Sequence, residues 1–293
     1  MPVRPLLGLI FALVWAVPAE AARALLVGSF TWTVSSPDFG GISGIDLFTD
    51  GMSFRAVEDT GFSFLGRFER DGTGRVTAVR TGPIMPLRDG DGRPLGEADR
   101  DAEGLALGAG GSFFVSFERS DRVVRYAGTA SRATLLTGGT DLTWLAYNKG
   151  LEALAADADG TLYAIAEQPG RGRAGHTVLR RDGTRWTEAF EIPADGTWRV
   201  TGADFGPDGK LYVLQRDFWG LVGFRTRVLR LSIDRGAVVG TETLLETRAG
   251  RHDNLEGIAV WRDATGNLRL TLVSDDNRSM LQRTEVVDYR IEE

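Results

Sequence analysis

Short runs of alternating apolar and polar residues, separated by Asp-Gly turns, make up most of the chain. The turn dipeptides are Asp50-Gly51, Asp71-Gly72, Asp89-Gly90, Asp91-Gly92, Asp159-Gly160, Asp182-Gly183, Asp195-Gly196 and Asp208-Gly209. Alternation with a period of two, interrupted by glycine-containing turns, is typical of antiparallel strands. A repeat of about 3.6 residues, which would indicate helices, is almost absent. The pattern therefore predicts an all-β protein.

A hairpin of similar sequence occurs five times along the chain. The copies begin at Ser43, Glu103, Glu152, Thr201 and Glu256, which are 60, 49, 49 and 55 residues apart. The third copy reads EALAADADGTLYAIAE, and two further strand-like runs, TVLRRDG and WTEAFEIP, follow it. Four strands in about 50 residues is the repeat of a β-propeller blade.

The hairpins therefore predict a β-propeller of five four-stranded blades, with residues 22–293 forming this single domain. The last repeat has only three strands, so the run ARALLVGSFTW near the N-terminus is expected to complete it and close the ring. Six blades remain an alternative if a divergent blade lies within residues 60–100. A two-sheet sandwich and a β-solenoid are the other all-β alternatives, although the repeat is longer than that of a solenoid.

Polar residues recur at both ends of the repeated hairpin. Because the first strand of a blade lines the central channel and the second returns antiparallel to it, these positions should converge at one mouth of the channel. The hairpins start at Ser43, Glu103, Glu152, Thr201 and Glu256, and they end at Glu58 or Asp59, Glu118, Glu167, Arg216 and Asp275. The mouth should therefore hold several carboxylates and one arginine.

Clustered carboxylates raise one another's pKa unless a positive charge lies among them. The chain has no cysteine and two histidines, so oxygen atoms would be the main metal ligands, and these suit Ca²⁺ better than Zn²⁺. We predict that Ca²⁺ is held by Glu103, Glu118, Glu152, Glu256 and Asp275. The alternative is that each glutamate caps its own hairpin and binds no ion.

Other polar residues near the predicted mouth are candidates for catalysis and substrate binding. His252 could act as a general acid or base, Glu167 as a base, and Arg216 could steer an anionic group. The predicted substrate-binding residues are Asn148, Lys149, Asn254, Asn277 and Arg278. The chain has no G-x-S-x-G, G-x-x-x-x-G-K-[ST] or H-E-x-x-H motif, so an enzymatic function would depend on metal-assisted hydrolysis.

The N-terminal residues have the features of a secretory signal. Arg4 precedes an apolar run from Leu6 to Val17, and Ala19-Glu20-Ala21 follows as a small-x-small cleavage pattern. Residues 1–21 are therefore predicted to be a signal peptide, which leaves no stable membrane span after cleavage and a periplasmic or secreted protein. An uncleaved anchor is the alternative, but the run is short for a bilayer span of about 20 residues. The net charge of -6 argues against nucleic acid as a partner.

Five segments of the chain resemble the phytase-like family described as "esterase-like activity of phytase". They are GGISGIDL, DAEGLAL, GLEALAADADGTLYAIAE, NLEGIAV and LVSDDN, and they extend from about residue 40 to near the C-terminus. The resemblance implies a propeller that hydrolyses a phosphate or other ester, with Ca²⁺ as its implied cofactor. The chain departs from its own repeat at Thr201 and Arg216, and it has EDTG at 58–61 where aspartate-arginine-glycine is common in the family.

Together these features predict an exported hydrolase that acts on a small anionic ester or phosphoester at an acidic channel mouth. A non-catalytic propeller that binds a ligand or partner at the same mouth is the alternative. A lactonase-type propeller hydrolase would differ only in its substrate.

Overall fold

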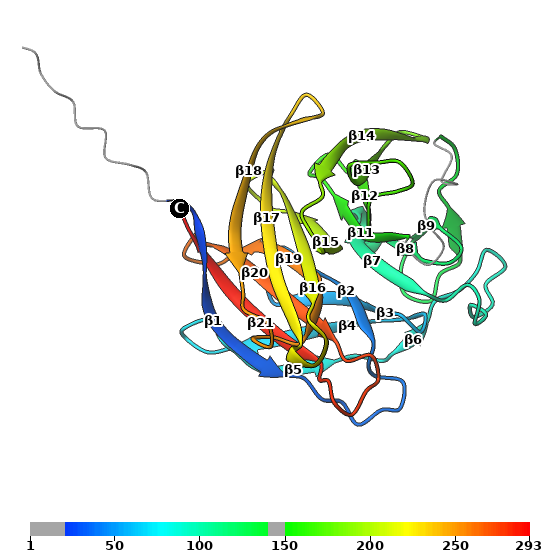
Figure 1. Cartoon of the computed structure of the whole chain (residues 1–293). Helices are drawn as coiled ribbons and strands as arrows, with labels where there is room; N and C mark the ends of the chain where they lie inside the picture. The colour runs from blue at the N-terminus through cyan, green and yellow to red at the C-terminus, as the bar shows by residue number, and fades with distance from the viewer. Residues whose placement is uncertain (1–20, 140–149) are drawn as a thin grey trace, which may run out of the picture.

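The computed structural model describes residues 21–139 and 150–293, which form five antiparallel sheets around a central channel (Figure 1). The first blade contains β2 (Ile42–Leu47), β3 (Ser53–Glu58), β4 (Phe62–Arg70) and β5 (Val76–Thr81), and the short β6 (Met85–Pro86) also pairs with β4. The second contains β7 (Ala102–Leu107), β8 (Phe113–Phe117), β9 (Arg122–Tyr126) and β10 (Ala133–Leu135). The third contains β11 (Leu151–Ala156), β12 (Leu162–Ala166), β13 (Gly175–Asp182) and β14 (Arg185–Pro193).

The remaining two blades complete the ring. The fourth contains β15 (Arg199–Phe205), β16 (Leu211–Phe218), β17 (Phe224–Asp234) and β18 (Ala237–Glu246). The fifth contains β19 (Asn254–Arg262), β20 (Leu268–Asp275), β21 (Glu285–Glu292) and β1 (Arg23–Thr31). Two short 3₁₀ turns, η1 (Ala109–Gly111) and η2 (Gly220–Val222), are the helical elements of the described residues.

The predicted five-bladed propeller is confirmed. Residues 60–100, where a sixth blade was an alternative, contain β4, β5 and β6, which all belong to the first blade. The expected ring closure is also confirmed, because β1 pairs antiparallel with β21 as the outermost strand of the last blade. Figure 1 shows this pairing as the blue strand lying beside the red one.

Apolar residues from neighbouring blades fill the spaces between the sheets. The alternating pattern places one face of each sheet against the next blade, so each cluster of buried side chains joins two blades. Between the fifth and first blades, Trp32 packs edge-on against Phe54 and Phe64. Burial of each such large side chain contributes about 1.5–3 kcal/mol.

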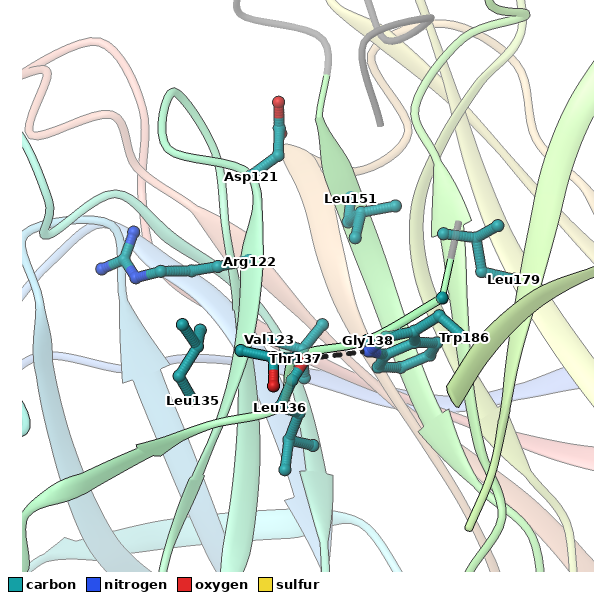
Figure 2. Close-up of a pocket in the computed structure, with 11 residues that line it drawn as sticks. Asp121, Arg122, Val123, Leu135, Leu136, Thr137, Gly138, Leu151, Leu179 and Trp186 are labelled. Carbon is teal, nitrogen blue, oxygen red and sulfur yellow. Dashed lines mark hydrogen bonds between the residues drawn. The ribbon is translucent and has the colours of Figure 1, made fainter. Parts of the chain in front are cut away.

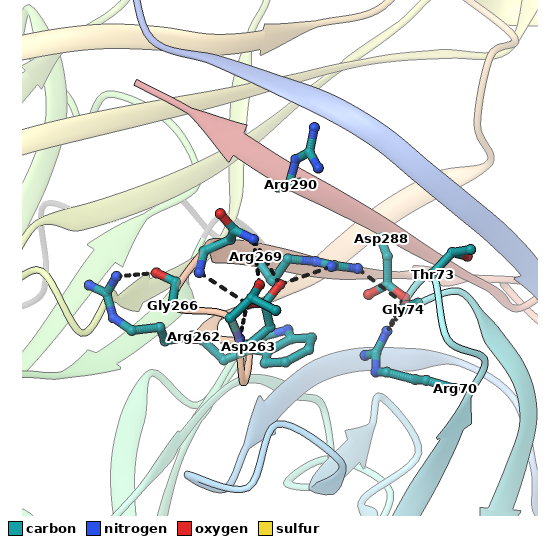
Figure 3. Close-up of polar contacts among 12 residues, drawn as sticks. Arg70, Thr73, Gly74, Arg262, Asp263, Gly266, Arg269, Asp288 and Arg290 are labelled. Atoms are coloured by element: carbon teal, nitrogen blue, oxygen red, sulfur yellow. Dashed lines mark hydrogen bonds and ion pairs between the residues drawn. The ribbon is translucent and has the colours of Figure 1, made fainter.

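The contact between the first and last blades also includes a buried polar network, which Figure 3 shows. Arg70 on β4 pairs with Asp288 on β21, and their side chains are 5% and 2% exposed. Arg70 Nη2 also donates to Thr271 Oγ1 at 3.2 Å, and Arg269 Nη2 donates to the Gly74 carbonyl at 3.2 Å. These bonds connect residues that are far apart in sequence and fix the blades where the ring closes.

Close packing of the innermost strands narrows the channel. A Cβ atom at Gly202 would lie 2.4 Å from the Glu256 carbonyl oxygen, and one at Gly44 would lie 2.8 Å from the Glu103 carbonyl oxygen. Glycine is therefore required where one innermost strand approaches the next. The space left between these strands is only about 10 Å³, so the channel is nearly closed at this level.

Two aspartates link neighbouring blades on the side of this constriction away from the predicted mouth. Asp46 Oδ2 accepts the Leu107 N–H at 2.7 Å, and Asp204 Oδ2 accepts the Val260 N–H at 2.6 Å. Burial raises the pKa of Asp46 to about 7, and burial together with the Asp46 charge raises the pKa of Asp204.

Within the described part of the chain, no helix is long and apolar enough to cross a bilayer.

Candidate metal centre at the channel mouth

One end of the channel opens into a cavity of about 190 Å³, which we call the acidic cavity. Among the described residues, its lining contains the carboxylates of Asp59, Asp101, Glu103, Glu118, Glu152, Glu167, Glu256 and Asp275, together with Arg216 and Asn277. The structure thus brings together residues from all five blades. The cavity contains each of the five predicted metal ligands and two of the three predicted catalytic residues.

A β-bulge in each innermost strand explains how the first residue of the repeat reaches the cavity. The strand register shifts around Ser43, Glu103, Glu152, Thr201 and Glu256. A bulge redirects a side chain from its regular alternation, and the three glutamates all line the acidic cavity. At the other two bulges a hydroxyl group stands instead, and Ser43 and Thr201 donate to the carbonyls of Ala102 and Leu255 in the next blade.

Two groups of three carboxylates have the spacing of a cation site. Asp101, Glu103 and Glu118 form one group, and Glu118, Glu152 and Glu167 form the other. One oxygen atom from each member lies within 4.8 Å of the corresponding atoms in its group. Glu118 belongs to both groups, so it lies between the two candidate positions. All three members of the second group are buried.

Glu152 is the residue whose surroundings most strongly indicate a missing counter-charge. Glu152 lines the cavity and is 7% exposed. Its carboxylate has no hydrogen bond or ion pair to any residue that the structure describes. Burial raises its pKa well above the usual value, and the charge of Glu167 raises it further. Burial and the Glu152 charge likewise raise the pKa of Glu103. A bound cation would reverse both shifts, because it favours the ionised carboxylates.

Arg216 places one positive charge among these acids. It forms an ion pair with Glu256, donates to Asn254 Oδ1 at 2.7 Å, and lies 3.9 Å from Glu167 Oε1. Asn254 in turn donates to Glu256 Oε1 at 2.8 Å. Glu256 therefore has an ion-pair partner, whereas Glu152 has none among the residues that the structure describes. Arg216 and Asn254 lie at the mouth as expected, but their direct contacts are with Glu256.

The loop that follows β20 has a structural role beside the cavity. Asp275 Oδ1 accepts the Asn277 N–H at 2.7 Å, and burial raises the pKa of Asp275 to about 8. Asn277 and Arg278 both adopt positive φ, at 46° and 48°, a strained conformation that is often found at functional sites. Asn277 lines the acidic cavity, as a substrate-binding residue would.

Arg278, predicted to bind substrate, instead contacts the loop before β2. Its guanidinium donates to the carbonyls of Pro37, Asp38 and Gly40. It also lies 3.7 Å from Glu58 Oε2, while the next residue, Asp59, lines the cavity. Of the two acids considered for the end of the first hairpin, Asp59 is thus the one at the mouth.

His252 lies outside the lining of the acidic cavity. It is 4% exposed, its Nε2 is 2.6 Å from the Tyr289 hydroxyl, and its Nδ1 is 3.9 Å from Glu285 Oε1. A catalytic role for His252 remains a prediction. Asn148 and Lys149 lie outside the described residues, so their predicted role also remains a prediction.

Among the residues that sequence reasoning missed, two with charged side chains lie at the mouth. Asp101 lines the acidic cavity, and Arg199 lines a neighbouring one. Each stands two positions before the bulge residue of its repeat, Glu103 or Thr201, and Asn254 stands at the same offset from Glu256. Comparing this offset across the repeats would have identified them.

The neighbouring cavity, which we call the side cavity, has a volume of about 410 Å³. It shares Glu167, Arg216 and Asn277 with the acidic cavity, so the two are adjacent. Its remaining described lining residues are Thr197, Arg199, Asp217, Phe218, Phe224 and Asn254. The mouth therefore combines a carboxylate cluster with a larger space of mixed polarity.

A third cavity, of about 330 Å³, lies between the second and third blades (Figure 2). Its lining is mainly apolar and includes Leu135, Leu136, Leu179 and Trp186, whose Nε1 donates to the Leu136 carbonyl at 3.1 Å. This cavity shares no lining residue with the acidic cavity. It therefore does not contribute to the candidate metal centre.

Several solved structures are similar to this chain at low sequence identity. Among solved structures, the PQQ-bound aldose sugar dehydrogenase from Streptomyces coelicolor is 13% identical, with a TM-score of 0.51 over 94% of this chain and 100% of that one. A protein of unknown function from Dyadobacter fermentans is 13% identical, with a TM-score of 0.47 over 88% of this chain and 78% of that one. A putative glucose dehydrogenase from Thermus thermophilus is 18% identical, with a TM-score of 0.39 over 86% of this chain and 83% of that one.

Sequence comparison is more specific than these structural similarities, which at such low identity concern the fold alone. No curated protein sequence matches the chain. The profile of the phytase-like family, described as esterase-like activity of phytase, matches residues 37–278. Because this match covers most of the chain, the protein belongs to the phytase-like family.

Proposed function

We propose that this protein is an exported hydrolase that binds Ca²⁺ in the acidic cavity and hydrolyses a phosphoester or another ester there. The observation that carries the proposal is the buried group formed by Glu118, Glu152 and Glu167. Three carboxylates this close together repel one another strongly in a buried site. A divalent cation would offset that repulsion, and membership of the phytase-like family supports ester hydrolysis as the use of the site.

The donor set favours calcium over other cations. The ligands offered are carboxylate oxygens, and Asn277, whose side chain has an amide oxygen, lines the same cavity. Ca²⁺ accepts about 6–8 oxygen ligands in flexible geometry, at distances of about 2.4 Å, whereas Zn²⁺ prefers nitrogen and sulfur. Glu118 and Glu152 would hold the ion, with Glu103 and Asp101 on the other side of Glu118.

A bound Ca²⁺ would polarise the ester and offset the negative charge that develops during hydrolysis. Glu167 lines both cavities, so it would be placed to accept a proton from a water molecule beside a substrate in the side cavity. The hydroxyl of that water joins the phosphorus or carbonyl carbon, and the bond to the ester oxygen breaks. Glu167 then returns the proton to the leaving oxygen. Arg216 forms an ion pair with Glu256 beside this centre.

Export is the second part of the proposal. It is supported by the apolar run from Leu6 to Val17 and by the small-x-small pattern at Ala19-Glu20-Ala21. The absence of cysteine is compatible with an exported domain, because a domain of this size can form a sufficient core without disulfides. The chain would then function in the periplasm or outside the cell.

The proposal is tested by titrating the mature protein with calcium and then assaying phosphoesters and carboxyl esters. We expect calcium to raise the melting temperature of the wild-type protein and to be required for turnover. Glu152→Gln should lose both effects, whereas Glu97→Gln, which changes an exposed acid, should lose neither. Turnover that is unchanged in Glu152→Gln would contradict the catalytic proposal and favour a propeller that only binds a ligand.

A further inference from the structure

The side cavity differs from the acidic cavity because its lining contains an arginine side chain with no acidic partner among the described residues. Arg199 lines it, and the Arg199 side chain has no hydrogen bond or ion pair to any residue that the structure describes. The acid in the same lining, Asp217, already accepts hydrogen bonds from Thr197 Oγ1 and Trp219 Nε1, each at 2.6 Å. Arg199 therefore brings to the side cavity a positive charge that is not paired with any described acid.

Two phenylalanines form the apolar part of the same lining. The ring centroids of Phe218 and Phe224 are 4.9 Å apart, and Phe218 is 64% exposed. The exposed apolar surface continues into Leu221 and Val222 of η2. A large exposed apolar surface next to a cavity marks a binding surface more often than it marks a simple solvent-facing loop.

The loop that carries Asn277 also has exposed apolar side chains. Met280 and Leu281 on it are both almost fully exposed, and Asn277 itself lines both cavities. The acidic and side cavities also share Glu167. A small molecule in the side cavity would therefore place one end directly beside the candidate metal centre.

We propose that the side cavity binds the non-reacting part of the substrate, and that this part is an aryl or short alkyl group bearing an anion. The anion would lie opposite Arg199, and the apolar group would pack against Phe218 and Phe224. This inference rests on the proposed function in one respect, because it assumes that the reacting ester lies over the acidic cavity. It narrows the substrate class to amphiphilic anionic esters, and it disfavours uniformly polar esters.

The proposal is tested by calorimetric titration of the full mature protein, in millimolar calcium, with phenylphosphonate and with methylphosphonate. The two probes carry the same anion, but only the first has an aryl group. We expect phenylphosphonate to bind about tenfold more tightly, which corresponds to about 1.4 kcal/mol. Phe218→Ala should abolish this difference, and Arg199→Gln should weaken the binding of both probes by about tenfold.

Matched variants separate these effects from general damage. Leu221→Ala removes a side chain of the same exposed apolar surface that does not line the cavity, and Arg235→Gln removes an exposed arginine elsewhere. Both should bind the probes like the wild-type protein. Since Phe218 is exposed, Phe218→Ala should keep the wild-type melting temperature.

Two results would overturn the inference: equal affinity of the wild-type protein for the two probes, or an unchanged preference in Phe218→Ala. Either result would leave the hydrolase proposal standing, provided that Glu152→Gln still abolished turnover. Conversely, a protein that binds no calcium but prefers phenylphosphonate in a Phe218-dependent manner would refute the hydrolase proposal and retain the apolar subsite.

Discussion

Arg216 on β16 forms an ion pair with Glu256 on β19, in the next blade. Arg216 is the residue that interrupts the acidic pattern of the repeats, and its partner Glu256 belongs to that pattern. In the other blades an acid stands at the position of Arg216, as Glu118 and Glu167 illustrate. One arginine among eight described carboxylates of the cavity cannot offset them all. Glu118, Glu152 and Glu167 lie close together in one buried group, and the cation is proposed to bind there.

Arg216→Gln should destabilise the protein in the absence of calcium, because it leaves Glu256 charged and unpaired in a buried site. We expect a loss of about 2 kcal/mol in the free energy of unfolding, measured by urea titration in a chelating buffer. Adding Glu256→Gln should restore most of this stability. If the double variant is as unstable as Arg216→Gln, the ion pair is not the cause.

Glu118→Gln should weaken calcium binding more than Asp101→Asn does. Glu118 belongs to both carboxylate groups, whereas Asp101 already has an ion pair with Arg119 at 2.7 Å. We expect a loss of affinity of about tenfold or more for Glu118→Gln and about twofold for Asp101→Asn, measured by calorimetry. The reverse order would show that the ion lies in the group of Asp101 and Glu103 alone.

Asp46→Asn should stabilise the protein at alkaline pH. Folding raises the pKa of Asp46 from 3.8 to about 7, so folding favours the protonated form. That contribution is complete below about pH 4 and is lost as the pH rises through about 7. Asparagine can still accept the Leu107 N–H and carries no charge.

We therefore expect Asp46→Asn to gain about 1–3 kcal/mol over the wild-type protein at about pH 8, and nothing at about pH 4, in denaturant titrations. Asp159→Asn, which changes an exposed turn residue, is the matched control and should show no pH-dependent gain. A gain of equal size at both pH values would rule out titration of Asp46 as the cause.

Arg70→Met should weaken the closure of the ring. It removes one partner of the buried pair with Asp288 and leaves the carboxylate without its cation, at a cost of about 3 kcal/mol. Arg290→Met is the control, because its pair with Glu292 is 44% exposed on the arginine side and should be worth less than about 1 kcal/mol. Thermal unfolding of both variants measures the difference. Equal losses would mean that the Arg70 network does not secure the first and last blades.

The repeated hairpin made much of the fold predictable from sequence. Each copy has the same strand alternation and the same turn, so their order and spacing indicated five blades, and the spare run at Arg23–Thr31 indicated how the ring closes. Repetition also identified the mouth, because equivalent positions in blades around one axis must converge. Asp101 and Arg199 escaped notice because the alignment began two residues after them.

The strand period and the repeat alone indicate which residues reach the mouth, and they do so for Glu103, Glu118, Glu152, Glu167 and Glu256 alike. The folded structure is needed to say which of these acids has a cationic partner. Glu256 meets Arg216 from the neighbouring blade, while Glu152 meets two other acids. A carboxylate's partners are set by contacts between blades about 50 residues apart in sequence, and no local pattern encodes those contacts.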